Sequence, residues 1–148
     1  MLVTESPAPR LDDQICFALY SASRALTARY RELLIPLGVT YPQYLALLVL
    51  WESDAITVTE LGHRLNLDSG TLSPLLKRME KAGLIVRGRR HEDERTVQVT
   101  LTPYGDDLRL LTSGIPELVC TATGLGIPQL QAITGQVTAI AAHVRRSL

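Results

Sequence analysis

Three features of the sequence predict a mainly α-helical fold with one small β element. Apolar residues recur at helical spacing over most of the chain, between polar caps and Pro or Gly breaks. Near the middle, a short helical segment, a three-residue turn and a second helical segment follow one another. The period then changes to two in a pair of short runs around a polar tip. This order predicts a winged helix-turn-helix with a two-stranded β wing and further helices at both chain ends.

Length and composition set the first limits. The 148 residues are the size of one domain, so we expect a single domain over residues 1–148. No apolar run approaches the roughly 20 residues that cross a bilayer, and residues 1–10 lack the pattern of a signal peptide, so we expect a cytoplasmic protein. The formal net charge is zero, but residues 61–91 hold seven Lys or Arg against two acids. This segregation of charge favours a surface that binds nucleic acid.

The chain before the turn predicts three helices. A short mobile arm, residues 1–10, precedes a long helix over residues 11–34. Thr40 caps a second helix over residues 44–52, which is almost wholly apolar and therefore expected to be buried on all sides. A capping box at residues 57–60 begins a third, short helix.

The helix after the turn, within residues 68–83, carries the clearest functional pattern. Asp68 caps it, and four apolar residues at helical spacing would face a core. The opposite face has small residues near its start, which allow close approach to base edges, and cations further along, which suit phosphates. Taken alone, this stretch also fits a solvated amphipathic helix. The expected DNA contacts of this helix are Ser69, Gly70, Thr71, Ser73, Pro74, Lys77 and Arg78.

A basic hairpin is expected next. Strands are predicted over residues 84–90 and 95–101, with residues 91–94 as an exposed polar tip. A solvated β-ribbon is the alternative, but directly after a recognition helix such a hairpin is typical of a wing that reaches a minor groove or phosphates. Asp93 and Arg95 are expected to pair with each other or to anchor the tip. The expected DNA contacts of the wing are Arg87, Arg89, Arg90, Asp93 and Arg95.

Two more helices are expected, over residues 104–123 and 127–146. Together with the first helix they carry more apolar surface than a DNA-binding head could cover. We therefore expect residues 1–38 and 103–148 to form a homodimer interface, and residues 40–101 to form the head. Such a dimer would read two half-sites of a pseudo-palindromic operator in double-stranded DNA.

Three stretches carry a family resemblance: LDDQICFALY at residues 11–20, TYPQYLAL at 40–47 and LDSGTLSPLLKRME at 67–80. With the order of elements, they make the chain similar to the MarR family of winged-helix regulators, and in particular to its organic hydroperoxide resistance branch (OhrR). The resemblance implies a homodimeric repressor that releases its operator when a cysteine near the N-terminus is oxidised by an organic hydroperoxide.

Cys16 is the matching cysteine. It falls in the first turn of the long helix, where the partial positive charge of the helix end favours the thiolate that attacks a peroxide. Tyr20 lies on the same helical face, and Phe17 adds an apolar neighbour that would favour organic hydroperoxides. The resemblance further implies that Tyr30 and Tyr41 donate hydrogen bonds to the sulfur across the dimer interface. An inert core thiol is the alternative for an isolated cysteine.

Cys120 has three possible roles. Some members of the family complete the reaction with a small thiol, and others with a second cysteine in the C-terminal half. The resemblance to the second kind implies an intersubunit disulfide between Cys16 and Cys120. The third possibility is that Cys120 packs in the interface.

The remaining patterns are weak. His63, His91 and His143 are too scattered for a metal site, and no phosphate-binding loop, nucleophile elbow or paired-carboxylate motif occurs, so we expect no metal, no cofactor and no enzyme. Two alternatives remain. One is a regulator gated by a phenolic ligand, with incidental cysteines. The other is a cysteine-dependent peroxidase, against which the basic helix and wing argue.

Overall fold

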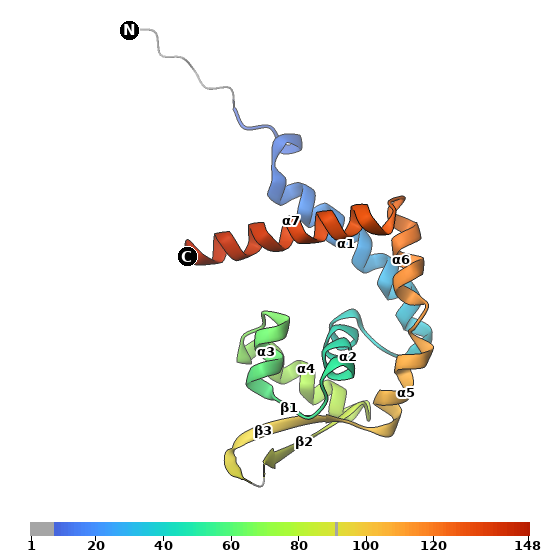
Figure 1. Cartoon of the computed structure of the whole chain (residues 1–148), viewed down its shortest axis with the longest axis vertical. Coiled ribbons are helices and arrows are strands. Elements are labelled where there is room, and N and C mark those ends of the chain that lie inside the picture. Colours follow the sequence, from blue (N-terminus) through green and yellow to red (C-terminus); the bar gives the residue numbers. More distant parts are fainter. Residues whose placement is uncertain (1–7, 91) are drawn as a thin grey trace.

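The computed structural model describes residues 8–90 and 92–148, and Figure 1 shows a mainly helical chain with a small three-stranded antiparallel sheet. The predicted winged helix-turn-helix is confirmed, and the expected arm falls largely on residues 1–7, outside the described residues. In chain order the elements are η1 (Leu11–Asp13), α1 (Ile15–Leu34), η2 (Ile35–Leu37), α2 (Tyr41–Glu52), β1 (Ile56–Thr57), α3 (Val58–Leu65), α4 (Ser69–Lys81), β2 (Ile85–Arg90), β3 (Asp93–Leu101), α5 (Pro103–Leu111), α6 (Ile115–Thr123) and α7 (Ile127–Arg146).

Helix α2 is the centre of the head, and it begins earlier than predicted. Thr40 and Gln43 form a reciprocal capping box, so the helix starts at Tyr41, and a proline is tolerated in its first turn. The helix is not buried on all sides, because Leu45 is only half-buried and the side chain of Leu48 is 36% exposed. Its apolar composition predicted burial on all sides, whereas the head covers only part of its surface.

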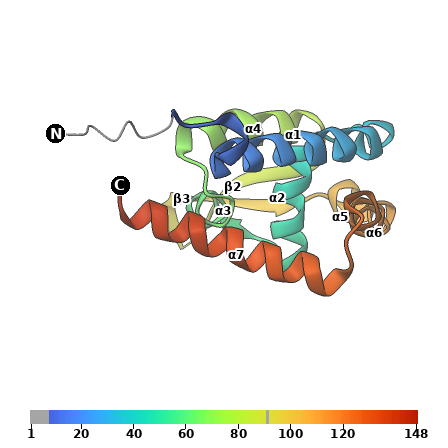
Figure 2. The ribbon, with the colours of Figure 1, turned by 90° about the horizontal axis from the view of Figure 1, so that it is seen from above.

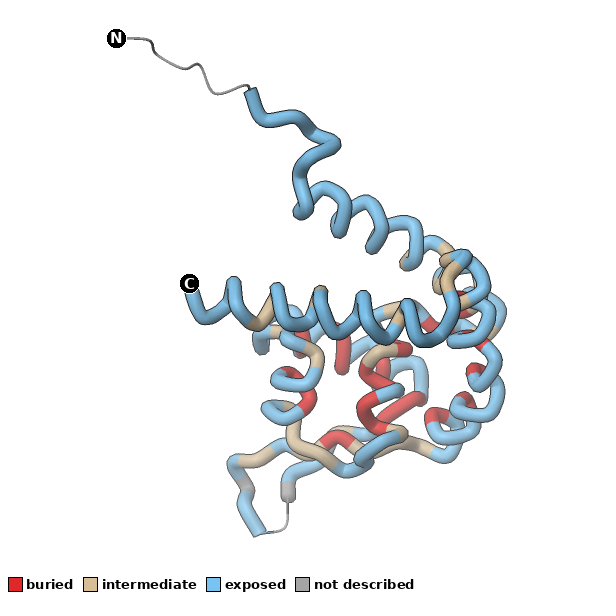
Figure 3. The backbone as a smooth tube through the Cα atoms, turned by 45° about the horizontal axis from the view of Figure 1, so that its top comes forward, coloured by how far each residue is buried: buried red, intermediate tan, exposed pale blue. Residues whose placement is uncertain are grey.

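The core lies mainly between α2, α3, α4 and the base of the wing, and it extends to the end of α1 and to α5 and α6 through Leu34, Leu108 and Val119. Figure 3 shows buried residues concentrated there, while α1 and α7 are exposed along most of their length. Each fully buried aliphatic side chain contributes about 1.5–3 kcal/mol through its removal from water. The largest fully buried side chains are Leu34, Leu47, Leu50, Leu61, Leu72, Leu76, Met79, Leu84, Ile85, Val99 and Leu108.

The sheet has the strand order β1-β3-β2, so the wing carries a third strand that the sequence did not predict. Strand β1 has only two residues, too few to show an alternating pattern, and Ile56 pairs with Val99 of β3. Strand β3 begins at Asp93 rather than at Arg95, which shortens the predicted tip. Of that tip, His91 lies outside the described residues.

The predicted helix over residues 104–123 is two helices, α5 and α6. The hydroxyl of Thr112 donates to the Leu108 carbonyl (2.9 Å) and that of Ser113 to the Leu110 carbonyl (2.8 Å), which competes with continuation of the helix. Gly114 then precedes Pro116, which has no backbone N–H for the next helical bond. These residues are a stop signal that apolar periodicity alone does not reveal.

Helices α1 and α7 cross in Figure 1, but they do not pack along their length. Seen from above in Figure 2, they lie on opposite sides of the molecule. Within the described part of the chain, no single helix is long and apolar enough to cross a bilayer. Only α1–η2 and α2 taken together, bent by 78°, reach that length and hydropathy.

Candidate DNA interface and cysteine site

The recognition helix α4 buries one face and exposes the other, as predicted. Its core face holds Leu72, Leu75, Leu76 and Met79, each 3% exposed or less. On the exposed face the small residues come first and the cations follow one to two turns later, in the order needed for bases and then phosphates. The sequence-predicted contacts Ser69, Gly70, Thr71, Ser73, Pro74, Lys77 and Arg78 are all exposed.

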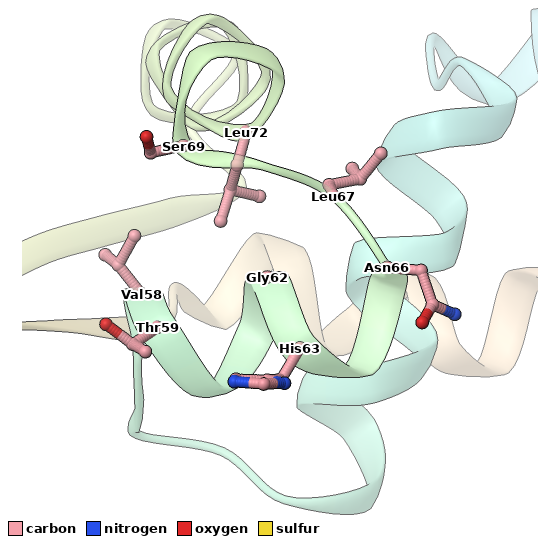
Figure 4. Close-up of a pocket in the computed structure, with 8 residues that line it drawn as sticks. All are labelled: Val58, Thr59, Gly62, His63, Asn66, Leu67, Ser69 and Leu72. Atoms are coloured by element: carbon pink, nitrogen blue, oxygen red, sulfur yellow. The ribbon is translucent and has the colours of Figure 1, made fainter. Parts of the chain in front are cut away.

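The turn between α3 and α4 is held tightly. Asn66 ends α3 in the left-handed conformation (φ 53°), which asparagine tolerates well. A Cβ atom at Gly62 would lie 3.1 Å from the Leu67 carbonyl oxygen, so glycine allows the turn to fold back closely on α3. Figure 4 shows the resulting hollow of about 360 Å³, with Ser69 of α4 and His63 of α3 on its rim. The start of the recognition helix therefore sits at an open notch in the surface.

Asp68 fixes the first turn of α4. Its Oδ1 accepts a hydrogen bond from the Thr71 backbone N–H (2.8 Å), and this bond holds the pKa of the Asp68 carboxyl below its ordinary value of 3.8. Because the folded-state pKa is lowered, the ionised cap stabilises the fold above the unfolded pKa. That contribution is lost as the pH falls through the folded value.

We expect Asp68→Ala to lower the melting temperature by a few degrees at pH 7. Asp68→Asn should lower it less, because asparagine also caps helices well. The advantage of wild type over Asp68→Asn should shrink below about pH 4, because only the aspartate titrates. Thermal melts of the three proteins from pH 7 to about pH 3 measure both effects. A constant difference between wild type and Asp68→Asn over that range would contradict this account of the cap.

The wing presents some of its predicted contacts and not others. Arg89 and Arg95 are exposed, and the side chain of Arg90 is outside the described part of the chain. Asp93 anchors the tip: its carboxylate accepts from the Arg95 backbone N–H (2.9 Å) and from the Thr96 hydroxyl (2.8 Å), which lowers its pKa. Among the described residues no ion pair joins the Asp93 and Arg95 side chains, so Asp93 holds the tip through the Arg95 backbone and not through its guanidinium.

Unlike Arg89 and Arg95, Arg87 has its guanidinium engaged within the protein. Its guanidinium Nε and Nη2 donate to Glu80 Oε2 (2.9 and 2.7 Å), and both side chains are about 70% buried. The arginine that the sequence grouped with the DNA contacts thus links the wing to α4.

A tyrosine cluster lies where α1 meets α2. The rings of Tyr30 and Tyr41 are 4.6 Å apart between centroids, and those of Tyr30 and Tyr44 are 5.8 Å apart. Burial raises the pKa of all three phenols, so each remains a neutral hydrogen-bond donor. The sequence reasoning missed Tyr44. Its place in the TYPQY run, three residues after Tyr41 and so on the same helical face, was the available signal.

Tyr30 and Tyr41 line one groove with Cys120. The groove has a volume of about 710 Å³ and runs between α1, α6 and α7, with Leu26, Leu130 and other apolar side chains along it. Cys120 is half-buried there, and its thiol donates to the Leu125 carbonyl at 3.7 Å. Three of the predicted sensor residues therefore come together within one chain.

Cys16 is not among them. It is the second residue of α1 and is exposed, as are its neighbours Phe17 (41%) and Tyr20 (60%). The Tyr20 ring does not line the groove of Cys120 but stacks with Arg24, whose guanidinium carbon lies 5.5 Å from the ring centroid. Both cysteines are free thiols and are not at disulfide distance within the chain. Among the described residues no group of three His, Cys, Asp or Glu could hold a metal ion.

A helix-turn-helix with an exposed basic recognition face and an adjoining β wing defines a winged-helix DNA-binding protein. The sequence profile of the MarR family matches residues 39–97. The organic hydroperoxide resistance transcriptional regulator of Bacillus subtilis is 53% identical over 107 residues, 72% of this chain and 73% of that protein. The chain therefore belongs to the MarR family, and like its relatives it is a transcriptional regulator rather than an enzyme.

Solved structures agree with this assignment. Reduced AbfR bound to DNA is 32% identical with a TM-score of 0.76, covering 91% of this chain and 94% of that one. AbfR, from Staphylococcus epidermidis, is also known in a disulfide-formed state, 36% identical with a TM-score of 0.61, over 90% of this chain and 93% of that one.

Proposed function

We propose that the protein is a homodimeric, cytoplasmic repressor that senses organic hydroperoxides through Cys16 and then releases its operator. The observation that carries the proposal is the position of Cys16, which is a free thiol exposed in the first turn of α1, where a hydroperoxide can reach it. The similarity to a regulator named for organic hydroperoxide resistance supports the same chemistry.

The exposed apolar faces of α1 and α7 support a dimer. Ile15 is 60% exposed and Leu26 37%, and on α7 Ile133, Ile140 and Val144 are 41–53% exposed. These side chains lie on long helices at the two chain ends, which reach out from the head (Figures 1 and 3). A second copy related by twofold symmetry would bury them, with residues 1–38 and 103–148 as the interface and about 40–101 as the head.

The same dimer would complete the sensor. Helix α6, which carries Cys120, lies beside the C-terminal half of α1 in Figures 1 and 2, whereas Cys16 begins α1. A helix of 20 residues spans about 30 Å, and a disulfide needs Cα atoms within about 7 Å. A bond between Cys16 and Cys120 of one chain would therefore require a large movement. We therefore propose that Cys16 inserts into the groove of the partner subunit, beside the Tyr30, Tyr41 and Cys120 that line it.

The reaction balances in two steps. The Cys16 thiolate attacks the terminal peroxide oxygen, which breaks the O–O bond, leaves a sulfenic acid and releases an alkoxide that takes a proton from water to become the alcohol. The Cys120 thiol of the partner subunit then attacks that sulfur, forming the disulfide and releasing water. Neutral phenols in the groove would donate hydrogen bonds to the sulfur and to the departing oxygen. The apolar lining would favour organic hydroperoxides over hydrogen peroxide.

Mixing two single-cysteine variants tests this pairing. After stoichiometric cumene hydroperoxide, wild type should run as a covalent dimer on a non-reducing gel, and neither Cys16→Ser nor Cys120→Ser should do so. Subunits of the two variants exchanged into one dimer should again cross-link, because one intersubunit pair remains. No cross-link in the mixture, or one in Cys120→Ser alone, would contradict a Cys16–Cys120 bond between subunits.

A further inference from the structure

We infer that Glu80 is a positioning residue for DNA binding, which fixes the wing relative to the recognition helix through Arg87. The inference rests on the DNA-binding part of the proposed function and is independent of the peroxide response. Glu80 lies in the last turn of α4 and Arg87 lies in β2, so the pair joins the two elements that would enter neighbouring grooves.

The contact is made by three donors on one carboxylate. Arg87 Nε and Nη2 reach Glu80 Oε2, and the Arg87 backbone N–H donates to Glu80 Oε1 at 3.1 Å. The backbone bond fixes the strand itself, and the planar guanidinium fork fixes the direction of the side chain. The Arg87 donors hold the pKa of the Glu80 carboxyl below its ordinary range, so the pair stays charged at neutral pH.

The Glu80–Arg87 pair holds the wing at a point beyond its base. The backbone N–H of Leu84 donates to the Met79 carbonyl (3.0 Å), which holds the base of the wing, and Arg87 lies three residues further out. Among the side chains that the structure describes, which leave out those of Arg90, His91 and Glu94, no other hydrogen bond or ion pair joins α4 to β2 or β3. Ile85 packs in the core with α4 at the base of the wing, and further out the wing is aligned with α4 by this polar contact and by the strand pairing.

The sign of the effect of Glu80 on DNA affinity distinguishes a positioning role from a purely electrostatic one. Glu80 is an acid on an otherwise basic surface, so its neutralisation should strengthen DNA binding and free Arg87 for a phosphate. If Glu80 positions the wing, its neutralisation should instead weaken binding to the specific site. The sign of the change in affinity therefore separates the two roles.

The experiment compares Glu80→Gln, Arg87→Gln and wild type on a duplex that the wild-type protein selects from a random-sequence pool, and on a scrambled duplex. We expect each variant to bind the selected duplex about tenfold more weakly, with its binding to the scrambled duplex nearly unchanged. The slope of log affinity against log salt should stay the same for Arg87→Gln, because Arg87 makes no phosphate contact. Glu92→Gln is the matched control, since it removes an exposed wing acid and should not weaken binding.

Two further measurements keep the result interpretable. Thermal melts and circular dichroism show whether a variant has lost its fold, and the charge-swapped Glu80→Arg/Arg87→Glu protein should recover part of the lost affinity. Tighter binding by Glu80→Gln, or a salt slope lowered by about one per subunit in Arg87→Gln, would overturn the inference. Failure of wild type to select any duplex would instead count against the proposed function.

Discussion

Cys16→Ser should bind operator DNA as tightly as wild type and should fail to release it when an organic hydroperoxide is added. A serine hydroxyl is nearly the same size as the thiol but is not a nucleophile toward peroxides, so the change removes the chemistry and leaves the exposed helix end intact. Fluorescence anisotropy of a labelled operator, titrated with cumene hydroperoxide, measures this directly. We expect wild-type binding to fall by at least tenfold and the variant to stay unchanged.

Cys120→Ser is the matched control for the same titration. It should still form the Cys16 sulfenic acid, which dimedone traps and mass spectrometry detects, but should not form the disulfide. A ligand-gated regulator with incidental cysteines behaves differently, because Cys16→Ser would then respond to its effector as wild type does. Release of DNA by Cys16→Ser on addition of peroxide would rule out Cys16 as the sensor.

Arg78→Ala should weaken operator binding and flatten its salt dependence. Arg78 is exposed on α4, past the small residues that approach the bases, where a cation suits a phosphate. Each phosphate contact contributes about 0.9 to the slope of log affinity against log salt, so the loss of two per dimer should lower that slope by roughly 2. Affinity should fall by a similar factor for the selected and the scrambled duplex, because phosphates carry no sequence.

Arg109→Ala provides the control for general charge. Arg109 is an exposed arginine of α5, outside the head, and its loss changes the net charge by the same amount. It should leave the slope unchanged. Equal effects of the two substitutions would mean that the exposed face of α4 is not the DNA-binding face.

The residues that could be predicted from sequence are those whose role is local. Thr40, Thr57 and Asp68 cap helices through contacts within three residues, and the structure contains each of those hydrogen bonds. The alternation of residues 95–101 likewise predicted β3, because one face of that strand meets the core through Val99. Helix caps and strand alternation can be predicted because each depends on residue types at a fixed spacing in the sequence.

Features that depend on distant partners could not be predicted. Strand β1 exists because Ile56 pairs with Val99, more than forty residues away. Arg87 looked like a DNA contact because its partner Glu80 lies in a different element, on the other side of the turn between α4 and β2, where no spacing rule pairs two side chains. The same limit applies to the sensor, since nothing in one chain shows where the Cys16 of another subunit would lie.

The most direct test of the account is a DNase I footprint of one operator with reduced protein, with protein treated with one equivalent of cumene hydroperoxide per subunit, and with the treated protein after dithiothreitol. We expect protection of two half-sites about one helical turn apart by the reduced protein, its loss after oxidation and its return after reduction. Protection that persists while mass spectrometry shows Cys16 fully oxidised would contradict the claim that this cysteine controls DNA binding.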